Sequence, residues 1–84
     1  MKEIHADKYR EIGLRISYCR RCRGFTQEKL AEMVGLSAAY IGQVEAPNVK
    51  KAISLDVLFD VATVLNVSPF WFLLSEKEFN ILDV

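Results

Sequence analysis

Hydrophobic residues recur along this chain at spacings of three, four and seven, which is the pattern of helices that bury one face. The strict polar–apolar alternation of a half-buried strand does not occur. In the first predicted helix, over about residues 7–22, the apolar stripe consists of Tyr9, Ile12, Ile16 and Cys19. The pattern predicts an all-α fold.

Capping and turn residues place four further helices, at 27–34, 38–45, 55–65 and from 69 onward. Each begins after a residue with a hydroxyl side chain. This hydroxyl can accept a hydrogen bond from one of the first backbone amides of the helix, which have no acceptor within the helix itself. These side chains are Thr26, Ser37, Ser54 and Ser68. Three helices are followed by a residue that favours the left-handed conformation of a helix end: Gly24, Gly35 and Asn66. The sequence therefore predicts five helices, while the tail, residues 75–84, fits a helix or a strand.

With 84 residues the chain can form one small core, and we expect a single domain, 1–84, with its folded core over about residues 7–74. Its hydrophobic content of 51% excludes a disordered chain. The longest purely apolar run, residues 70–74, is too short to cross a bilayer, and the polar N-terminus does not resemble a signal peptide. We therefore expect a soluble cytoplasmic protein with no membrane partner.

The net charge of zero hides an uneven distribution. Residues 1–51 hold ten of the eleven Lys and Arg residues but only six of the eleven Asp and Glu residues. Residues 52–84 hold Lys77 against five Asp and Glu residues and are correspondingly acidic. A basic half can face phosphate groups while the acidic half faces away from them.

Residues 27–46, QEKLAEMVGLSAAYIGQVEA, have the spacing of a helix-turn-helix. Ala31 is small where the two helices must approach each other, and Gly35 occupies the turn, where a positive φ is needed. Leu36, Ile41 and Val44 share one face of helix 38–45, the second helix of this motif, and fix it to the rest of the protein. Its opposite face is left for a partner.

This sequence resembles the lambda-repressor-like, or Cro/Xre-type, helix-turn-helix family over about residues 12–74. The resemblance is carried by IGLRI at 12–16, Arg20, FTQEKLA at 25–31, VGLS at 34–37, YIGQVE at 40–45 and SLDVLFDVATVLNVS at 54–68. It implies a compact five-helix DNA-binding domain that docks helix 38–45 in the major groove of double-stranded DNA. It further implies a transcriptional regulator, most often a repressor that binds a palindromic operator as a homodimer. From the sequence we infer no cofactor and no small-molecule ligand, and an effector ligand is left open.

Each residue of an α-helix is rotated by 100° from the one before, so the direction of each side chain on the recognition helix, 38–45, can be assigned. With Ile41 and Val44 inward, Ala39, Gly42 and Gln43 point outward. The resemblance implies base contacts at positions 38, 39 and 43, which here are Ala38, Ala39 and Gln43. Gln43 suits the N6 and N7 edge of adenine, whereas the two alanines offer only apolar contact to a thymine methyl group.

Phosphate contacts are expected from four residues around this helix: Gln27, Tyr40, Lys50 and Lys51. Gln27 begins its helix, where backbone amides and the helix dipole favour an anion, and the family commonly places a phosphate-binding Gln there. The resemblance also implies a structural salt bridge between Arg20 and Glu45. The loop at 46–53 is longer than the short, glycine-containing turn usual in the family.

Cys19 and Cys22 have the spacing of redox and metal motifs. On a helix, however, Cys19 falls in the buried stripe and Cys22 does not. A tetrahedral zinc site would need further ligands, and His5 is the one histidine of the chain. We expect two reduced thiols, no metal site and no enzymatic activity. A thiol-based redox sensor is the weaker alternative, and a protein-interaction module on the same fold is the stronger one.

The chain carries more apolar surface than its core needs. Leu14, Tyr18 and Cys22 form a second stripe on the first helix, and Phe70 is apolar where the family often has a polar residue. The tail adds Phe79, Ile81, Leu82 and Val84. Because a small monomer rarely exposes so much apolar surface, either the tail or a second subunit should cover it. The dimeric habit of the family favours the second subunit.

Overall fold

The computed structural model describes residues 1–74 of the chain. Its helices are α1 (Ala6–Cys22), α2 (Gln27–Val34), α3 (Ala38–Glu45), α4 (Leu55–Leu65) and α5 (Pro69–Leu73). The predicted all-α fold is confirmed, and residues 1–74 contain no strand. One short element was not predicted: a 3-10 turn, η1 (Glu3–His5), leads into α1 and extends it toward the N-terminus. The tail, whose structure the sequence left undecided, lies outside the described residues.

The predicted caps account for the sharp helix starts. Thr26, Ser37 and Ser54 each accept a hydrogen bond from the backbone amide three residues on, at 3.0–3.2 Å. Ser68 accepts one from the amide of Phe70 at 3.2 Å, with Pro69 at the first position of α5. At the other end of α4, Asn66 adopts the left-handed conformation with φ 58°.

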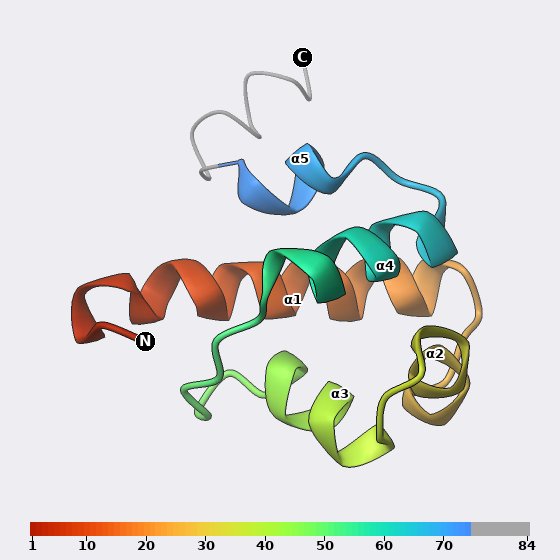
Figure 1. Ribbon diagram of the computed structural model, residues 1–84, viewed down its shortest axis with the longest axis horizontal. Coiled ribbons are helices and arrows are strands. Elements are labelled where there is room, and N and C mark those ends of the chain that lie inside the picture. Colours follow the sequence, from red (N-terminus) through yellow and green to blue (C-terminus); the bar gives the residue numbers. More distant parts are fainter. Residues whose placement is uncertain (75–84) are drawn as a thin grey trace.

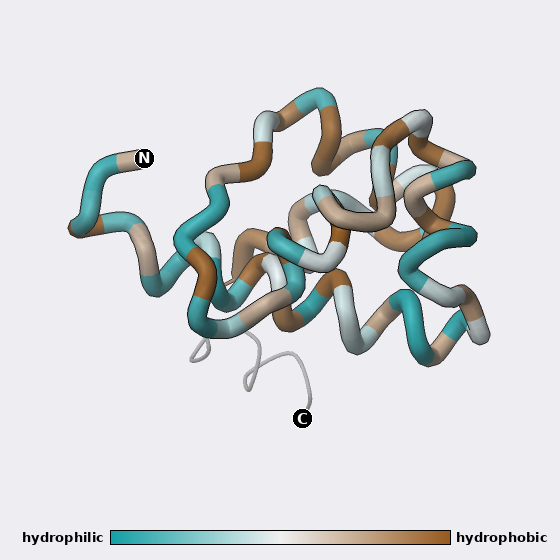
Figure 2. The backbone as a smooth tube through the Cα atoms, turned by 90° about the horizontal axis from the view of Figure 1, so that it is seen from below, coloured by the Kyte–Doolittle hydropathy of each residue, from teal (hydrophilic) through white to brown (hydrophobic). Residues whose placement is uncertain are grey.

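The helices are arranged around α1, which runs along the length of the molecule (Figure 1). α4 packs beside it, and α3 and α5 lie on opposite sides of this pair. α2 bridges α3 and α4, so that the α2–α3 unit is held from two directions. Hydrophobic and hydrophilic stretches alternate along the chain, as expected of helices with one buried face (Figure 2).

The core is formed where these buried faces meet. Ile16 of α1, Leu30 of α2, Ile41 of α3, Leu65 of α4 and Phe72 of α5 are each at most 1% exposed. Every helix therefore contributes a fully buried side chain, and burial of this apolar surface is the main stabilising term. No helix within residues 1–74 is long and apolar enough to cross a membrane.

α1 and α3 cross so closely that a side chain does not fit between them. A Cβ atom on Gly13 of α1 would overlap the carbonyl oxygen of Val44 in α3. The glycine therefore permits a backbone contact that fixes α3 against α1, the longest helix of the fold.

Two arginines bind backbone carbonyls at helix ends. Arg23 donates from Nε to the carbonyl of Leu65 at 2.7 Å, at the end of α4. The exposed Arg23 side chain therefore links the end of α1 to the end of α4. Arg15 of α1 donates to the carbonyls of Phe72 and Leu74, at the end of α5.

Candidate nucleic-acid interface

The recognition helix α3 has one buried and one exposed face. Ile41 and Val44 are 1% and 5% exposed, whereas Ala39 and Gln43 are exposed to solvent. The turn before α3 is fixed by Gly35, with φ 71°, and by a bond from the Leu36 amide to the carbonyl of Ala31 at 2.9 Å. The outward-facing residues are thus presented on a helix whose inner face is anchored in the core.

The outward face is almost without side chains. Ala38 is half-buried and packs against the core, and Ala39 is small. Gly42 is half-buried because the side chain of Gln27 lies over it, with Gln27 Oε1 3.5 Å from the position that a Cβ atom would occupy. Gln43 is therefore the exposed residue of α3 whose side chain can hydrogen-bond a base edge.

Arg20 and Glu45 form a bidentate ion pair between α1 and the end of α3. Arg20 Nε and Nη2 bind the two carboxylate oxygens at 2.8 and 2.9 Å, and the residues are 9% and 7% exposed. Arg20 Nη1 also donates to the carbonyl of Phe25 at 2.7 Å, which ties in the loop before α2. Hydrogen bonding to Glu45 raises the pKa of Arg20 above its ordinary value, although burial acts in the opposite direction.

Gln27 extends this network to α2. Its Nε2 donates to Glu45 Oε1 at 3.0 Å, so one carboxylate joins three helices. The pattern of the sequence did not reveal this bond, because the two residues are eighteen positions apart and meet only in the folded chain. One amide hydrogen of Gln27 is used here, which leaves the second hydrogen and the backbone amide in the first turn of α2 for an anion.

The residues beyond α2 that are expected to contact phosphates interact with other side chains of the protein in this structure. Lys51 Nζ lies 5.1 Å from the ring centre of Tyr40, which is half-buried and whose pKa is raised by burial. Lys50 Nζ binds Glu3 Oε1 at 2.5 Å, and both side chains are exposed. The Glu3 contact was missed from the sequence because it depends on the unpredicted turn η1.

The cysteines differ in their surroundings as the helical pattern predicts. Cys19 is buried, and burial raises the pKa of its thiol, whereas Cys22 is exposed. Both are free thiols. Within residues 1–74 no three His, Cys, Asp or Glu side chains are grouped so as to hold a metal ion.

Comparison with known proteins shows which family has this fold. A family model described as helix-turn-helix matches residues 16–72. The uncharacterized HTH-type transcriptional regulator YazB of Bacillus subtilis (strain 168) is 38% identical over 56 residues, which are 67% of this chain and 78% of YazB.

Two solved structures are similar over most of their length. The restriction-modification controller protein C.AhdI from Aeromonas hydrophila aligns with a TM-score of 0.73 and 31% identity, over 83% of this chain and 97% of its own. The hypothetical transcription factor NHTF from Neisseria aligns with a TM-score of 0.81 and 27% identity, over 93% of this chain and 85% of its own. The chain therefore belongs to the helix-turn-helix family of DNA-binding transcriptional regulators.

Proposed function

We propose that this protein is a sequence-specific transcriptional repressor that binds a palindromic operator as a homodimer. The observation that carries the proposal is the exposed face of α3, which lies beside the first turn of α2 and the two lysines of the following loop. A helix presented in this way fits the major groove, with the first turn of α2 on one side and the cations of the loop on the other available to phosphates.

In this proposal Gln43 reads the operator. A Gln side chain pairs with the N6 and N7 edge of adenine, and a good bidentate contact discriminates against other bases by about 1–3 kcal/mol. Ala38 and Ala39 add apolar contact to thymine methyl groups. Their small size also lets α3 approach the floor of the groove closely.

Four residues would position the domain without reading sequence: Gln27, Tyr40, Lys50 and Lys51. Glu45 holds the Gln27 side chain, so that its amide group is preorganised before DNA binds. Lys50 and Lys51 have to exchange Glu3 and the Tyr40 ring for phosphate. Phosphate contacts of this kind make affinity depend strongly on salt.

Dimerisation would use the apolar surface of α4 and α5. Phe59 is 46% exposed and Phe70 is 73% exposed, an arrangement that leaves two aromatic rings largely in water. α5 lies across the body from α3 (Figure 1), so pairing there leaves both recognition helices free for DNA. A two-fold dimer requires an operator with two-fold symmetry.

The test is selection of binding sites from random duplexes by the purified protein. We expect an enriched palindrome whose half-sites lie about 10 bp apart or a multiple of this. Gln43→Ala should then weaken the selected operator but leave random DNA and the salt dependence nearly unchanged. Lys50→Gln and Lys51→Gln should weaken both DNAs and lower the salt slope by about one unit per lost contact.

Two further outcomes have defined meanings. Transcription from a promoter overlapping the selected site should fall when the protein is added, and a rise would identify an activator. No enrichment, with weak binding insensitive to these substitutions, would favour the alternative, a protein-interaction module. One observation favours that alternative. Gln43 is the sole exposed residue of α3 whose side chain can hydrogen-bond a base edge, so few contacts are available to read a DNA sequence.

A further inference from the structure

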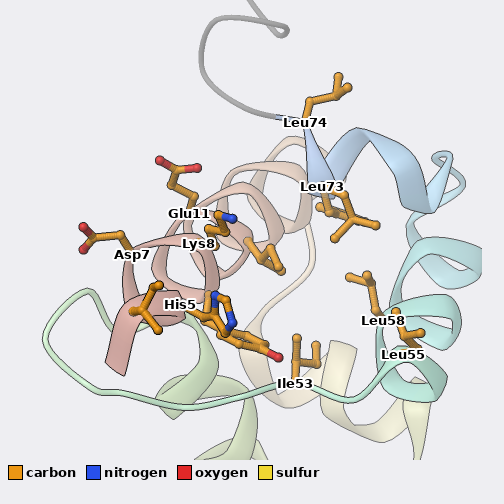
Figure 3. Close-up of a pocket in the computed structure, with 13 residues that line it drawn as sticks. His5, Asp7, Lys8, Glu11, Ile53, Leu55, Leu58, Leu73 and Leu74 are labelled. Carbon is orange, nitrogen blue, oxygen red and sulfur yellow. The ribbon is translucent and has the colours of Figure 1, made fainter. Parts of the chain in front are cut away.

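A groove of about 780 Å³ lies on the side of the molecule away from the α2–α3 turn. One wall comes from η1 and the first two turns of α1, the other from the start of α4, and the end of α5 closes the top (Figure 3). Its residues are not part of the proposed DNA-binding face. A volume of this size is enough to enclose several side chains.

The floor of the groove and a large part of its rim are apolar. Ile53 and Leu58 at its floor belong to the buried core. On the rim, Ile4, Leu55 and Leu73 are 79%, 60% and 48% exposed. The charged residues that also line it have both signs, so its affinity for a partner must come from apolar contact rather than from net charge. Leaving this surface in water is unfavourable by roughly 25 cal/mol per Å².

The polypeptide leaves the described region at the groove itself. Leu74 is one of the lining residues, and Arg15 of α1 binds the carbonyls of Phe72 and Leu74. These bonds fix the point from which the tail, residues 75–84, starts. Four of the last six residues of the tail are apolar: Phe79, Ile81, Leu82 and Val84.

We propose that the groove is the binding site of the chain's own tail, with Phe79 as the main apolar anchor. Four residues separate Leu74 from Phe79, and each extended residue spans about 3.3–3.6 Å, so Phe79 can lie up to roughly 16–18 Å from Leu74, which itself lines the groove. A short tether also gives the tail an effective concentration on the order of millimolar. A second copy of the chain, at ordinary protein concentrations, competes poorly with an attached segment.

The first experiment compares methyl NMR spectra of the full-length protein and the Phe79→Ser variant. Loss of the ring should shift the methyl signals of Ile4, Leu55 and Leu73. It should leave in place those of Leu14 and Met33, which are also exposed, at 40% and 44%, but lie outside the groove. Glu78→Gln is the matched control, because it changes the neighbouring residue without removing an apolar side chain. Unmoved groove signals would overturn the proposal.

A second measurement asks whether tail and groove stabilise each other. Phe79→Ser should lower the folding equilibrium constant about five- to tenfold, as expected for losing part of a buried ring. In a Leu55→Ser background the same substitution should have a much smaller effect, whereas in a Leu14→Ser background its effect should be unchanged. Additive effects with Leu55→Ser would contradict contact between the two residues.

A third measurement identifies the occupant. In a mixture of methyl-labelled and unlabelled chains, contacts between the Phe79 ring and the Leu55 methyl groups should arise within one chain. Contacts found only between differently labelled chains would overturn the proposal in favour of tail exchange within a dimer. None of these measurements uses DNA, so their outcome is independent of the proposed function.

Discussion

At the scale of single residues, the buried ion pair between Arg20 and Glu45 is the polar centre of the fold. It joins α1 to α3 and holds Gln27 of α2. Replacing one partner leaves the other charge poorly solvated, which costs more than the intact pair contributes.

Arg20→Ala should destabilise the protein by about 1–3 kcal/mol, because the Glu45 carboxylate loses two hydrogen bonds in a buried position. Urea denaturation measures this effect. Arg21→Ala is the control, since Arg21 is an exposed neighbour on the same helix. Equal midpoints for the two variants would show that the pair does not stabilise the fold.

Replacing the two mid-helix glycines, Gly13 and Gly42, by alanine should change the stability in opposite directions. Gly13→Ala should destabilise by about 1–3 kcal/mol, because the new methyl group overlaps the Val44 carbonyl and forces α1 and α3 apart. Gly42→Ala meets only ordinary contact with Gln27, so its better helix propensity should stabilise by up to about 1 kcal/mol. Thermal denaturation of both variants tests the crossing, and a stabilised Gly13→Ala protein would refute it.

At the scale of the elements, the sequence alone predicted the helix boundaries that depend on interactions between neighbouring residues. Thr26, Ser37 and Ser54 cap their helices through bonds to amides three residues away, so the starts of α2, α3 and α4 were predictable. The buried stripe of α1 followed from its spacing. Turn η1 was missed because it has neither a side-chain cap nor a buried residue that would mark it.

The interface was less predictable, since its details are long-range. Which residues of α3 face outward followed from helical geometry. The bond from Gln27 to Glu45 and the pairing of Lys50 with Glu3 depend on how distant segments meet, at separations of 18 and 47 residues. Single-sequence patterns carry no information on such pairs.

The contact between η1 and the loop after α3 leads to a test of the phosphate assignment. Glu3→Gln should strengthen DNA binding about two- to fivefold, because Lys50 no longer gives up an exposed ion pair, which is worth at most about 1 kcal/mol. Titration of operator DNA at several salt concentrations measures this. Asp60→Asn changes the net charge equally from α4 and is the control. The same gain in both variants would mean that only net charge matters.

At the scale of the whole molecule, the two proposed binding surfaces lie on different sides of α1. α2, α3 and the lysines of the following loop lie on one side of α1, and α5 lies on the other. The proposed dimer interface and the proposed DNA-binding face therefore do not compete for surface.

Phe70→Ser should shift the protein from dimer toward monomer and weaken operator binding at low protein concentration. Because the side chain is 73% exposed, the fold of each subunit should keep its stability within about 0.5 kcal/mol. Sedimentation equilibrium gives the association state. Met33→Ser, at an exposed position on α2, should leave dimerisation intact. A wild-type protein that sediments as a monomer at all concentrations would exclude the interface.

The two-faced character of α3 has a consequence for how such a protein changes over generations. Stability is determined by Ile41, Val44 and the Gly13 crossing, while Ala39 and Gln43 face solvent. Substitutions at the exposed pair should hardly alter folding, since surface changes away from special contacts are usually within about 0.5 kcal/mol. If these two residues read the operator as proposed, one or two mutations can change the target sequence without a compensating change elsewhere, and selection or design can then redirect the protein.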